Sequence, residues 1–299
     1  MQQDSHKAGF INIIGKPNVG KSTLMNALVG EKLSIITSKA QTTRHRIMGI
    51  INGPDFQIIY SDTPGIITPK YELHRSMMTF VKESLQDADI LLFVTDITEN
   101  PDNQENEDII KKVEGMTIPV FVLLNKIDLA TQDLVEERIN FWKAKIPNLK
   151  DVIPVSALES FNTQSVMDYI VASLPLHPPY FDKDQMTDKT ERFFAAEIIR
   201  EKIFLNYSRE IPYSTEVVIT DFKDEKEIIK MRAQIYVERD SQKGILIGKG
   251  GDALKRVGTQ ARKDMENFFG KKVFLETHVK VEPDWRTKEN ILKRFGYNN

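Results

Sequence analysis

Short apolar runs alternate with amphipathic stretches through the first 174 residues of the chain. Several of these runs are continuously apolar, which is typical of strands covered on both faces of a sheet. The predicted strands are Phe10–Ile14, Ile47–Ile51, Gln57–Ser61, Ile90–Thr95, Val120–Asn125 and Val152–Val155. The predicted helices are Ser22–Val29, Leu73–Gln86, Glu105–Glu114, Leu134–Lys145 and Thr163–Ser173. This alternation predicts an α/β domain with a doubly wound, mostly parallel six-stranded sheet, whose second and third strands form an antiparallel hairpin.

A proline-rich break ends this pattern, because Pro175, Pro178 and Pro179 cannot continue a helix. We therefore predict a first domain over residues 1–174, a linker over 175–190 and a second domain over 191–299. The second domain is predicted to be small and α+β. Its expected elements are a helix at Glu191–Phe204, strands at Glu216–Thr220 and Ile228–Glu238, a helix at Asp252–Phe268, a strand at Val273–Val281 and a short helix near Trp285–Arg294.

Composition and charge exclude several classes of protein. The chain has no cysteine, which excludes disulfides, thiolate metal sites and a cysteine nucleophile. No apolar run approaches the ~18 residues of a membrane span, and the polar start of the chain shows no secretory signal, so a cytoplasmic protein is expected. From Ile245 to the end, 12 Lys and Arg face 7 Asp and Glu, which hints at a polyanionic partner for this part. A solvated charged surface would explain the same excess.

A phosphate-binding motif follows the first predicted strand. The stretch matches GxxxxGK[ST] and comprises Gly15, Lys16, Pro17, Asn18, Val19, Gly20, Lys21 and Ser22. Its glycines let backbone N–H groups surround phosphate oxygens at a helix N-terminus. We expect Lys21 to lie between the β- and γ-phosphates and the Ser22 hydroxyl to bind Mg²⁺.

Three further short motifs lie at the ends of predicted strands. They are Asp62-Thr63-Pro64-Gly65, Asn125-Lys126-Ile127-Asp128 and Ser156-Ala157-Leu158. Asp62 is expected to hold hydrated Mg²⁺, and the Gly65 N–H to contact the γ-phosphate. The Asp128 carboxylate can accept both donors of guanine, a pair that adenine lacks. The Ala157 N–H is expected to reach guanine O6. Four motifs in this order predict a guanine-nucleotide site in the crevice of an open α/β sheet.

A second glycine-rich loop, Gly248-Lys249-Gly250-Gly251, has the GxxG pattern of KH domains. Small residues let a sugar–phosphate backbone approach closely, and a helix N-terminus with basic neighbours attracts phosphate. The alternative is a structural turn in an α+β domain. The residues predicted to bind single-stranded RNA are Ile247, Gly248, Lys249, Gly250, Gly251, Lys255, Arg256, Arg262 and Lys263.

The nucleotide motifs resemble those of translation-factor-type GTPases, and residues 39–46, Lys-Ala-Gln-Thr-Thr-Arg-His-Arg, resemble the first switch of the Era family. This resemblance implies that a switch threonine completes the Mg²⁺ shell, with Thr43 favoured and Thr42 as second choice. The position after DxxG, where many GTPases carry a water-orienting glutamine, is Ile66. Hydrolysis must then use another group, a backbone carbonyl or an added cation. Of these, the resemblance implies a monovalent cation, K⁺, with Asn18 as its candidate ligand; the alternative is that Asn18 only shapes the loop.

The two halves together resemble the Era family of bacterial ribosome-assembly GTPases over nearly the whole chain, including residues 196–202 and 261–265. The resemblance implies a slow, monomeric GTPase with a C-terminal KH domain. It implies binding near the 3′ end of 16S rRNA during assembly of the 30S small ribosomal subunit. It also implies peripheral contact with the inner face of the cytoplasmic membrane. The alternative is a membrane-associated signalling GTPase that acts through protein partners.

Overall fold

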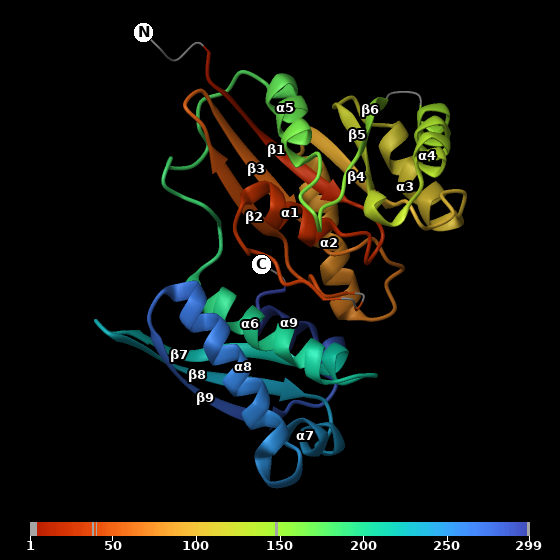
Figure 1. Ribbon diagram of the computed structural model, residues 1–299. Coiled ribbons are helices and arrows are strands. Elements are labelled where there is room, and N and C mark those ends of the chain that lie inside the picture. Colours follow the sequence, from red (N-terminus) through yellow and green to blue (C-terminus); the bar gives the residue numbers. More distant parts are fainter. Residues whose placement is uncertain (1–4, 38, 40, 147–148, 298–299) are drawn as a thin grey trace. The chain divides into compact units, whose positions relative to one another are not determined.

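The computed structural model describes residues 5–37, 39, 41–146 and 149–297. The chain divides into two compact units, which are described separately (Figure 1). The first comprises Met1–Thr68 and Met77–Asp188, and the second comprises Pro69–Ser76 and Lys189–Asn299. The domain and linker limits expected from the sequence, at residues 174 and 190, stay predictions. Within the described residues, no helix combines the length and hydropathy needed to cross a membrane.

The first unit is built on a six-stranded sheet of order β2-β3-β1-β4-β5-β6. The pair β2–β3 is antiparallel and the other pairs are parallel, as the sequence predicts. The strands are β1 (Lys7–Ile14), β2 (Ile47–Asn52), β3 (Phe56–Asp62), β4 (Ile90–Asp96), β5 (Val120–Asn125) and β6 (Leu149–Pro154). The helices are α1 (Lys21–Val29), α2 (Glu72–Gln86), α3 (Gln104–Glu114), α4 (Gln132–Lys145) and α5 (Thr163–Ser173); the first residues of α2, up to Ser76, are assigned to the second unit.

The central strands β4 and β5 are buried on both faces, which explains their unbroken apolar sequence. One face packs with α3 and α4, where Phe93 meets the fully buried Trp142 with ring centroids 5.2 Å apart. On the other face Phe121 meets Tyr169 of α5 at 5.9 Å. The sheet is therefore a rigid platform, and the loops after its parallel strands emerge at one edge.

The polar segment after α5 runs along the edge strand β2 of the first unit. Ile50 N–H donates to the Met186 carbonyl at 2.8 Å, and Met48 N–H donates to Asp188 Oδ1 at 2.9 Å. The Gln57 side chain accepts from the Tyr180 N–H at 2.7 Å and donates to the Phe181 carbonyl at 2.9 Å. The segment that the sequence predicts to be a linker is therefore bound to the sheet through backbone and side-chain hydrogen bonds.

The second unit has a three-stranded sheet of order β7-β8-β9, and α6 and α8 lie over one of its faces (Figure 1). Its elements are α6 (Glu191–Asn206), β7 (Glu216–Asp224), β8 (Ile228–Val237), α7 (Asp240–Ile247), α8 (Asp252–Phe269), β9 (Lys272–Val281) and α9 (Glu289–Arg294). The sequence did not predict helix α7. Its N-terminus is capped by Gln242, whose Oε1 accepts from the N–H groups of Glu238 and Arg239 at 2.9 and 3.2 Å.

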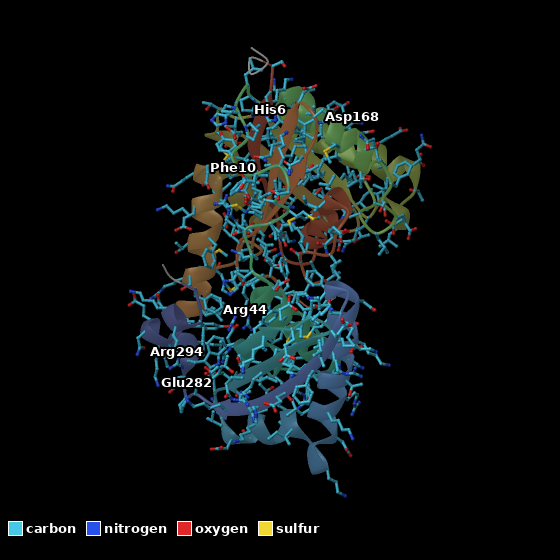
Figure 2. All side chains as sticks on the ribbon, turned by 90° about the vertical axis from the view of Figure 1, so that its left-hand side faces the viewer. His6, Phe10, Arg44, Asp168, Glu282 and Arg294 are labelled. Carbon is cyan, nitrogen blue, oxygen red and sulfur yellow. The ribbon has the colours of Figure 1, made fainter. Side chains whose placement is uncertain are left out.

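The buried residues of the second unit include an ion pair on α6, between Arg200 and Glu197. Arg200 donates from Nε and Nη2 to the two Glu197 oxygens at 2.7 and 2.6 Å. Burial alone would lower the pKa of Arg200, but the carboxylate of Glu197 raises it. At the surface, Arg294 of α9 pairs with Glu282 at 2.8 Å (Figure 2).

Candidate functional site

The phosphate-binding motif forms the loop between β1 and α1. Its backbone enters the left-handed region at Gly20, where φ is 99°, and a β-carbon there would lie 2.2 Å from Asn125 Nδ2. Only glycine meets both constraints. Among the described residues, no side chain caps the N-terminus of α1 that follows. Its backbone N–H groups therefore form an anion-binding site.

Lys21, the first residue of α1, is only 7% exposed and lies beneath the loop. Its ammonium group donates to the carbonyls of Lys16 and Gly15 at 2.7 and 3.1 Å. Burial lowers the pKa of Lys21 to about 8, although the nearby carboxylate of Asp62 acts in the opposite direction. The loop thus holds a desolvated cation that a phosphate group would stabilise.

The three predicted Mg²⁺ ligands are hydrogen-bonded to one another around the Asp62 carboxylate. Asp62 Oδ2 accepts from the Ser22 hydroxyl at 2.7 Å and from the Thr43 hydroxyl at 3.4 Å, and the two hydroxyls are 2.9 Å apart. Burial raises the pKa of Asp62, while the hydrogen bond from Ser22 and the charge of Lys21 lower it. Thr42 instead pairs with Thr37, with the two hydroxyl oxygens 2.8 Å apart. This arrangement favours Thr43 over Thr42, and the oxygen-rich donor set suits Mg²⁺.

The motif predicted to recognise guanine begins at Asn125, the last residue of β5, and is fixed by side-chain hydrogen bonds. Asn125 donates to the Val19 carbonyl at 2.8 Å and accepts from the Ala157 N–H at 2.9 Å, so it joins three loops. Asp128 accepts from the Ser156 hydroxyl at 2.5 Å. The Ala157 N–H, expected to contact guanine O6, is thus engaged by Asn125 in this structure.

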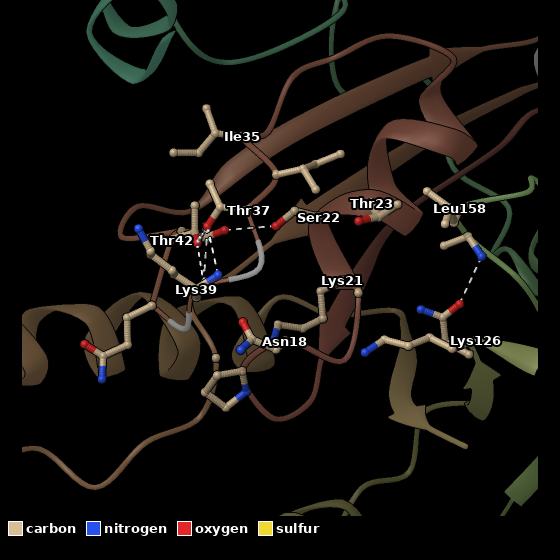
Figure 3. Close-up of a pocket in the computed structure, with 18 of the residues that line it drawn as sticks. Asn18, Lys21, Ser22, Thr23, Ile35, Thr37, Lys39, Thr42, Lys126 and Leu158 are labelled. Carbon is tan, nitrogen blue, oxygen red and sulfur yellow. Dashed lines mark hydrogen bonds between the residues drawn. The ribbon is translucent and has the colours of Figure 1, made fainter. Parts of the chain in front are cut away.

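A pocket of about 560 Å³ joins these loops, and most of the predicted nucleotide residues line it. In Figure 3, Lys21 and Ser22 lie between Thr37, Lys39 and Thr42 on one side and Lys126 and Leu158 on the other. The pocket is also lined by Thr23, Ile35, Ile36, Thr37 and Leu129, which the sequence did not indicate, and by Lys39 and Gln41 of the predicted switch stretch. Most of them belong to the irregular loop between α1 and β2, which has no hydrophobic period. Thr23, directly after Ser22, and Leu129, directly after Asp128, are the two that position alone could have indicated.

Several of the residues predicted to bind nucleotide lie outside the pocket lining. Those that do not line it are Gly15, Lys16, Val19, Asp62, Pro64, Ile66 and Ser156. Ile66 packs against the apolar core beside α3 and α4, so its side chain does not reach the phosphate end. Gly65 does line the pocket, and a β-carbon there would lie 2.9 Å from Pro17, so the two loops are in close contact.

The GxxG loop of the second unit joins α7 to α8. Gly248 has φ of 74°, and a β-carbon there would lie 2.6 Å from the Ala253 side chain, so glycine is required. Lys249 and Gly250 are exposed at the tip, and no side chain of the described residues caps the N-terminus of α8. Ile245, Leu246 and Ile247, predicted to be an apolar approach to the loop, form the last turn of α7.

The basic residues of α8 lie on two sides of the helix. Lys255 and Arg262 line a hollow of about 360 Å³ with Gly251 and with Leu275 and Thr277 of β9. Lys263 lines a different hollow, on the side of α6. Arg262 also pairs with Glu266 at 2.9 Å. The structure therefore groups Lys255 and Arg262 with the GxxG loop, and it separates Lys263 from them.

The sheet and the site together define a P-loop guanine-nucleotide-binding protein joined to a KH-type unit. The family described as 50S ribosome-binding GTPase matches residues 10–126, and the KH domain family matches residues 210–286. Relatives named GTPase Era match over nearly the whole chain. That of Staphylococcus haemolyticus is 45% identical over 98% of this chain and 97% of its own length. That of Geobacter metallireducens is 43% identical over 99% of this chain and 100% of its own.

The chain belongs to the Era family of GTPases. Its fold is similar to the crystal structure of an Era protein in complex with MgGDPNP and nucleotides 1506–1542 of 16S ribosomal RNA. The TM-score is 0.94 at 40% identity, covering 98% of this chain and 100% of that one. The structure of an Aquifex aeolicus Era variant bound to GDP·AlF4⁻ matches with the same values.

Proposed function

We propose that this chain binds and slowly hydrolyses GTP with Mg²⁺, and that the nucleotide state controls its binding of single-stranded RNA. The proposal of GTP binding and hydrolysis rests mainly on one observation. The side chains of Ser22, Thr43 and Asp62 are hydrogen-bonded to one another near Lys21, at the predicted phosphate end of one pocket. Lys21 and the Gly65 N–H stabilise the γ-phosphate charge, and Thr43 and Ser22 complete the Mg²⁺ shell. Mg²⁺ supplies charge neutralisation between the phosphates when it is bound.

The proposed RNA is the 3′ end of 16S rRNA, and the proposed role is assembly of the small ribosomal subunit. The relative of known structure holds nucleotides of that RNA, and it matches this chain over both units. The local support is the GxxG loop, which presents an uncapped helix N-terminus beside Lys255 and Arg262. Such a loop suits a single strand because the backbone approaches closely and the bases remain readable.

A monovalent cation is proposed as part of the hydrolysis site. Ile66 stands where a polar side chain would orient water, and it packs into the core. Asn18 lines the pocket with φ of 66°, in the loop that surrounds the phosphates. We assign to Asn18 the role of K⁺ ligand. K⁺ would then stabilise the negative charge that develops on the phosphates, at a site where the side chain of position 66 cannot orient water.

The test of the RNA function replaces the loop tip by carboxylates. Lys249→Asp with Gly250→Asp adds negative charge where phosphate is expected. Asp tolerates the left-handed backbone of Gly250 (φ 61°) better than most residues, and no atom lies within 4 Å of a β-carbon there. We expect affinity for a labelled strand from the 3′ end of 16S rRNA to fall roughly 100-fold. GTP hydrolysis without RNA should be unchanged.

A matched control variant lowers the net charge by the same amount, but at another place in the second unit. Lys226→Asp with Lys223→Gln alters the exposed β7–β8 hairpin, which lies in a different connection of the fold. This variant should bind RNA like the wild type, apart from a small, salt-dependent loss. Wild-type RNA affinity in a folded Lys249→Asp, Gly250→Asp variant, verified by circular dichroism, would contradict the RNA assignment and leave the GTPase assignment intact.

A further inference from the structure

A carboxylate outside all four nucleotide motifs holds the lysine of the guanine-recognition motif. Asp96 is the last residue of β4, and its Oδ2 accepts from Lys126 Nζ at 2.5 Å. The Asp96 side chain is 6% exposed, whereas that of Lys126 is 33% exposed. Asp96 and Lys126 are 30 positions apart in the chain, so neither the spacing nor the motif indicates the pair.

The position of Asp96 is fixed independently of Lys126. Its other oxygen, Oδ1, accepts from the Thr98 N–H at 2.9 Å and from the Thr98 hydroxyl at 2.7 Å. Its backbone pairs with Asn125 in the β4–β5 register, and the Ile97 N–H donates to the Asn125 carbonyl at 3.0 Å. The carboxylate is therefore an anchored group that Lys126 reaches.

The charge state of Asp96 suits this role. Burial alone would raise the pKa of Asp96, but hydrogen bonds from Lys126 and Thr98 outweigh it and hold the pKa below its ordinary value. The group is therefore an anion at neutral pH. A charge-assisted hydrogen bond to an immobile carboxylate restricts a long side chain that would otherwise sample many rotamers.

Lys126 contributes to the wall of the nucleotide pocket, on the same side as Leu158 in Figure 3. Its backbone is in the left-handed region, with φ of 66°, which turns the side chain out of the β5 direction. With the ammonium group held by Asp96, the apolar stem of Lys126 is available to cover the face of a purine. The same segment after β4 also holds the phosphate loop, because Glu99 pairs with Lys16 at 2.5 Å.

We propose that Asp96 is a positioning residue for guanine-nucleotide binding, acting through the Lys126 side chain. This inference rests on the proposed nucleotide function of the pocket. Asp96 itself contacts no nucleotide; it fixes the stem that covers the base and so slows nucleotide release.

The experiment measures dissociation of a fluorescent GDP analogue from the full-length protein. Asp96→Asn keeps an acceptor for Thr98 and removes the charge. We expect the analogue to dissociate roughly tenfold faster, the equivalent of one lost charge-assisted hydrogen bond. Asp151→Asn, which breaks an ion pair with Lys143 in the same unit, is the matched control and should leave the rate unchanged.

A double-variant cycle separates positioning from a general structural role. If Asp96 acts through Lys126, Asp96→Asn should not accelerate dissociation further in a Lys126→Met background. Additive effects, or a wild-type rate in folded Asp96→Asn, would overturn the proposal. A wild-type protein that does not bind the analogue would instead overturn the proposed function itself, so the two failures are distinguishable.

Discussion

The buried ammonium group of Lys21 should make the nucleotide-free protein less stable at neutral than at alkaline pH. Its pKa is about 8 in the folded chain against 10.5 for an ordinary lysine. Between these values the unfolded chain binds more protons, so the free energy of unfolding rises with pH. Below about pH 8 the full cost of burying the charge is present, and above the ordinary value it is gone. At 1.36 kcal/mol per pH unit, the whole difference corresponds to about 3 kcal/mol.

The measurement compares urea unfolding of wild-type protein with that of Lys21→Met, which removes the titrating group and nearly preserves the side-chain volume. Both chains carry Trp285→Phe, so that the buried Trp142 of the first unit alone reports by fluorescence. The unfolding free energy of the wild type should rise relative to Lys21→Met by about 2 to 3 kcal/mol between about pH 7 and about pH 10. Groups common to both chains cancel in this difference.

Saturating GDP and Mg²⁺ provide the control, because phosphate charges next to Lys21 would keep it protonated in the folded state. The rise in relative wild-type stability between neutral and alkaline pH should then be lost. A difference between the two nucleotide-free chains that stays constant over the range, or that falls as pH rises, would refute the reasoning about burial of this group.

Two further predictions concern the nucleotide site. Asp128→Asn should weaken GTP binding roughly 100-fold or more and should allow XTP to bind, since xanthine carries a carbonyl where guanine has its amine; unchanged GTP affinity without gain for XTP would show that Asp128 does not read the base. Replacing K⁺ by Na⁺ should slow GTP hydrolysis roughly tenfold in the wild type and should have little effect in Asn18→Ala. Equal rates in both salts would exclude the cation and leave the GTPase assignment standing.

The sheet of the first unit could be predicted from sequence because strands that are buried on both faces have continuously apolar sequences. Val120–Asn125 is buried throughout, and its limits agree with the prediction. The order of the motifs then located the nucleotide pocket, since parallel strands end at one edge. The lining residues Ile35 and Ile36 were missed because their loop has no period, and its path depends on contacts with distant motifs.

Helix α7 shows a different limit of sequence reasoning. Its stretch Asp240–Ile247 contains Gly244 and buries only Gln242 and Leu246, so no amphipathic pattern is visible. A buried glutamine that caps the backbone stabilises the helix, and this contact depends on tertiary structure. The separation of Lys263 from the GxxG loop likewise required the packing of α8 between α6 and β9.

The segment bound along β2 has a practical consequence for dividing the protein. An edge strand with free N–H and C=O groups is a template for pairing with other chains. Here residues after the last helix of the sheet unit occupy that edge, through the Met186 carbonyl and the Asp188 side chain. A recombinant GTPase unit that stops at Leu174 would leave the edge of β2 open to self-association. A unit that continues through Asp188 would keep the segment that hydrogen-bonds to this edge.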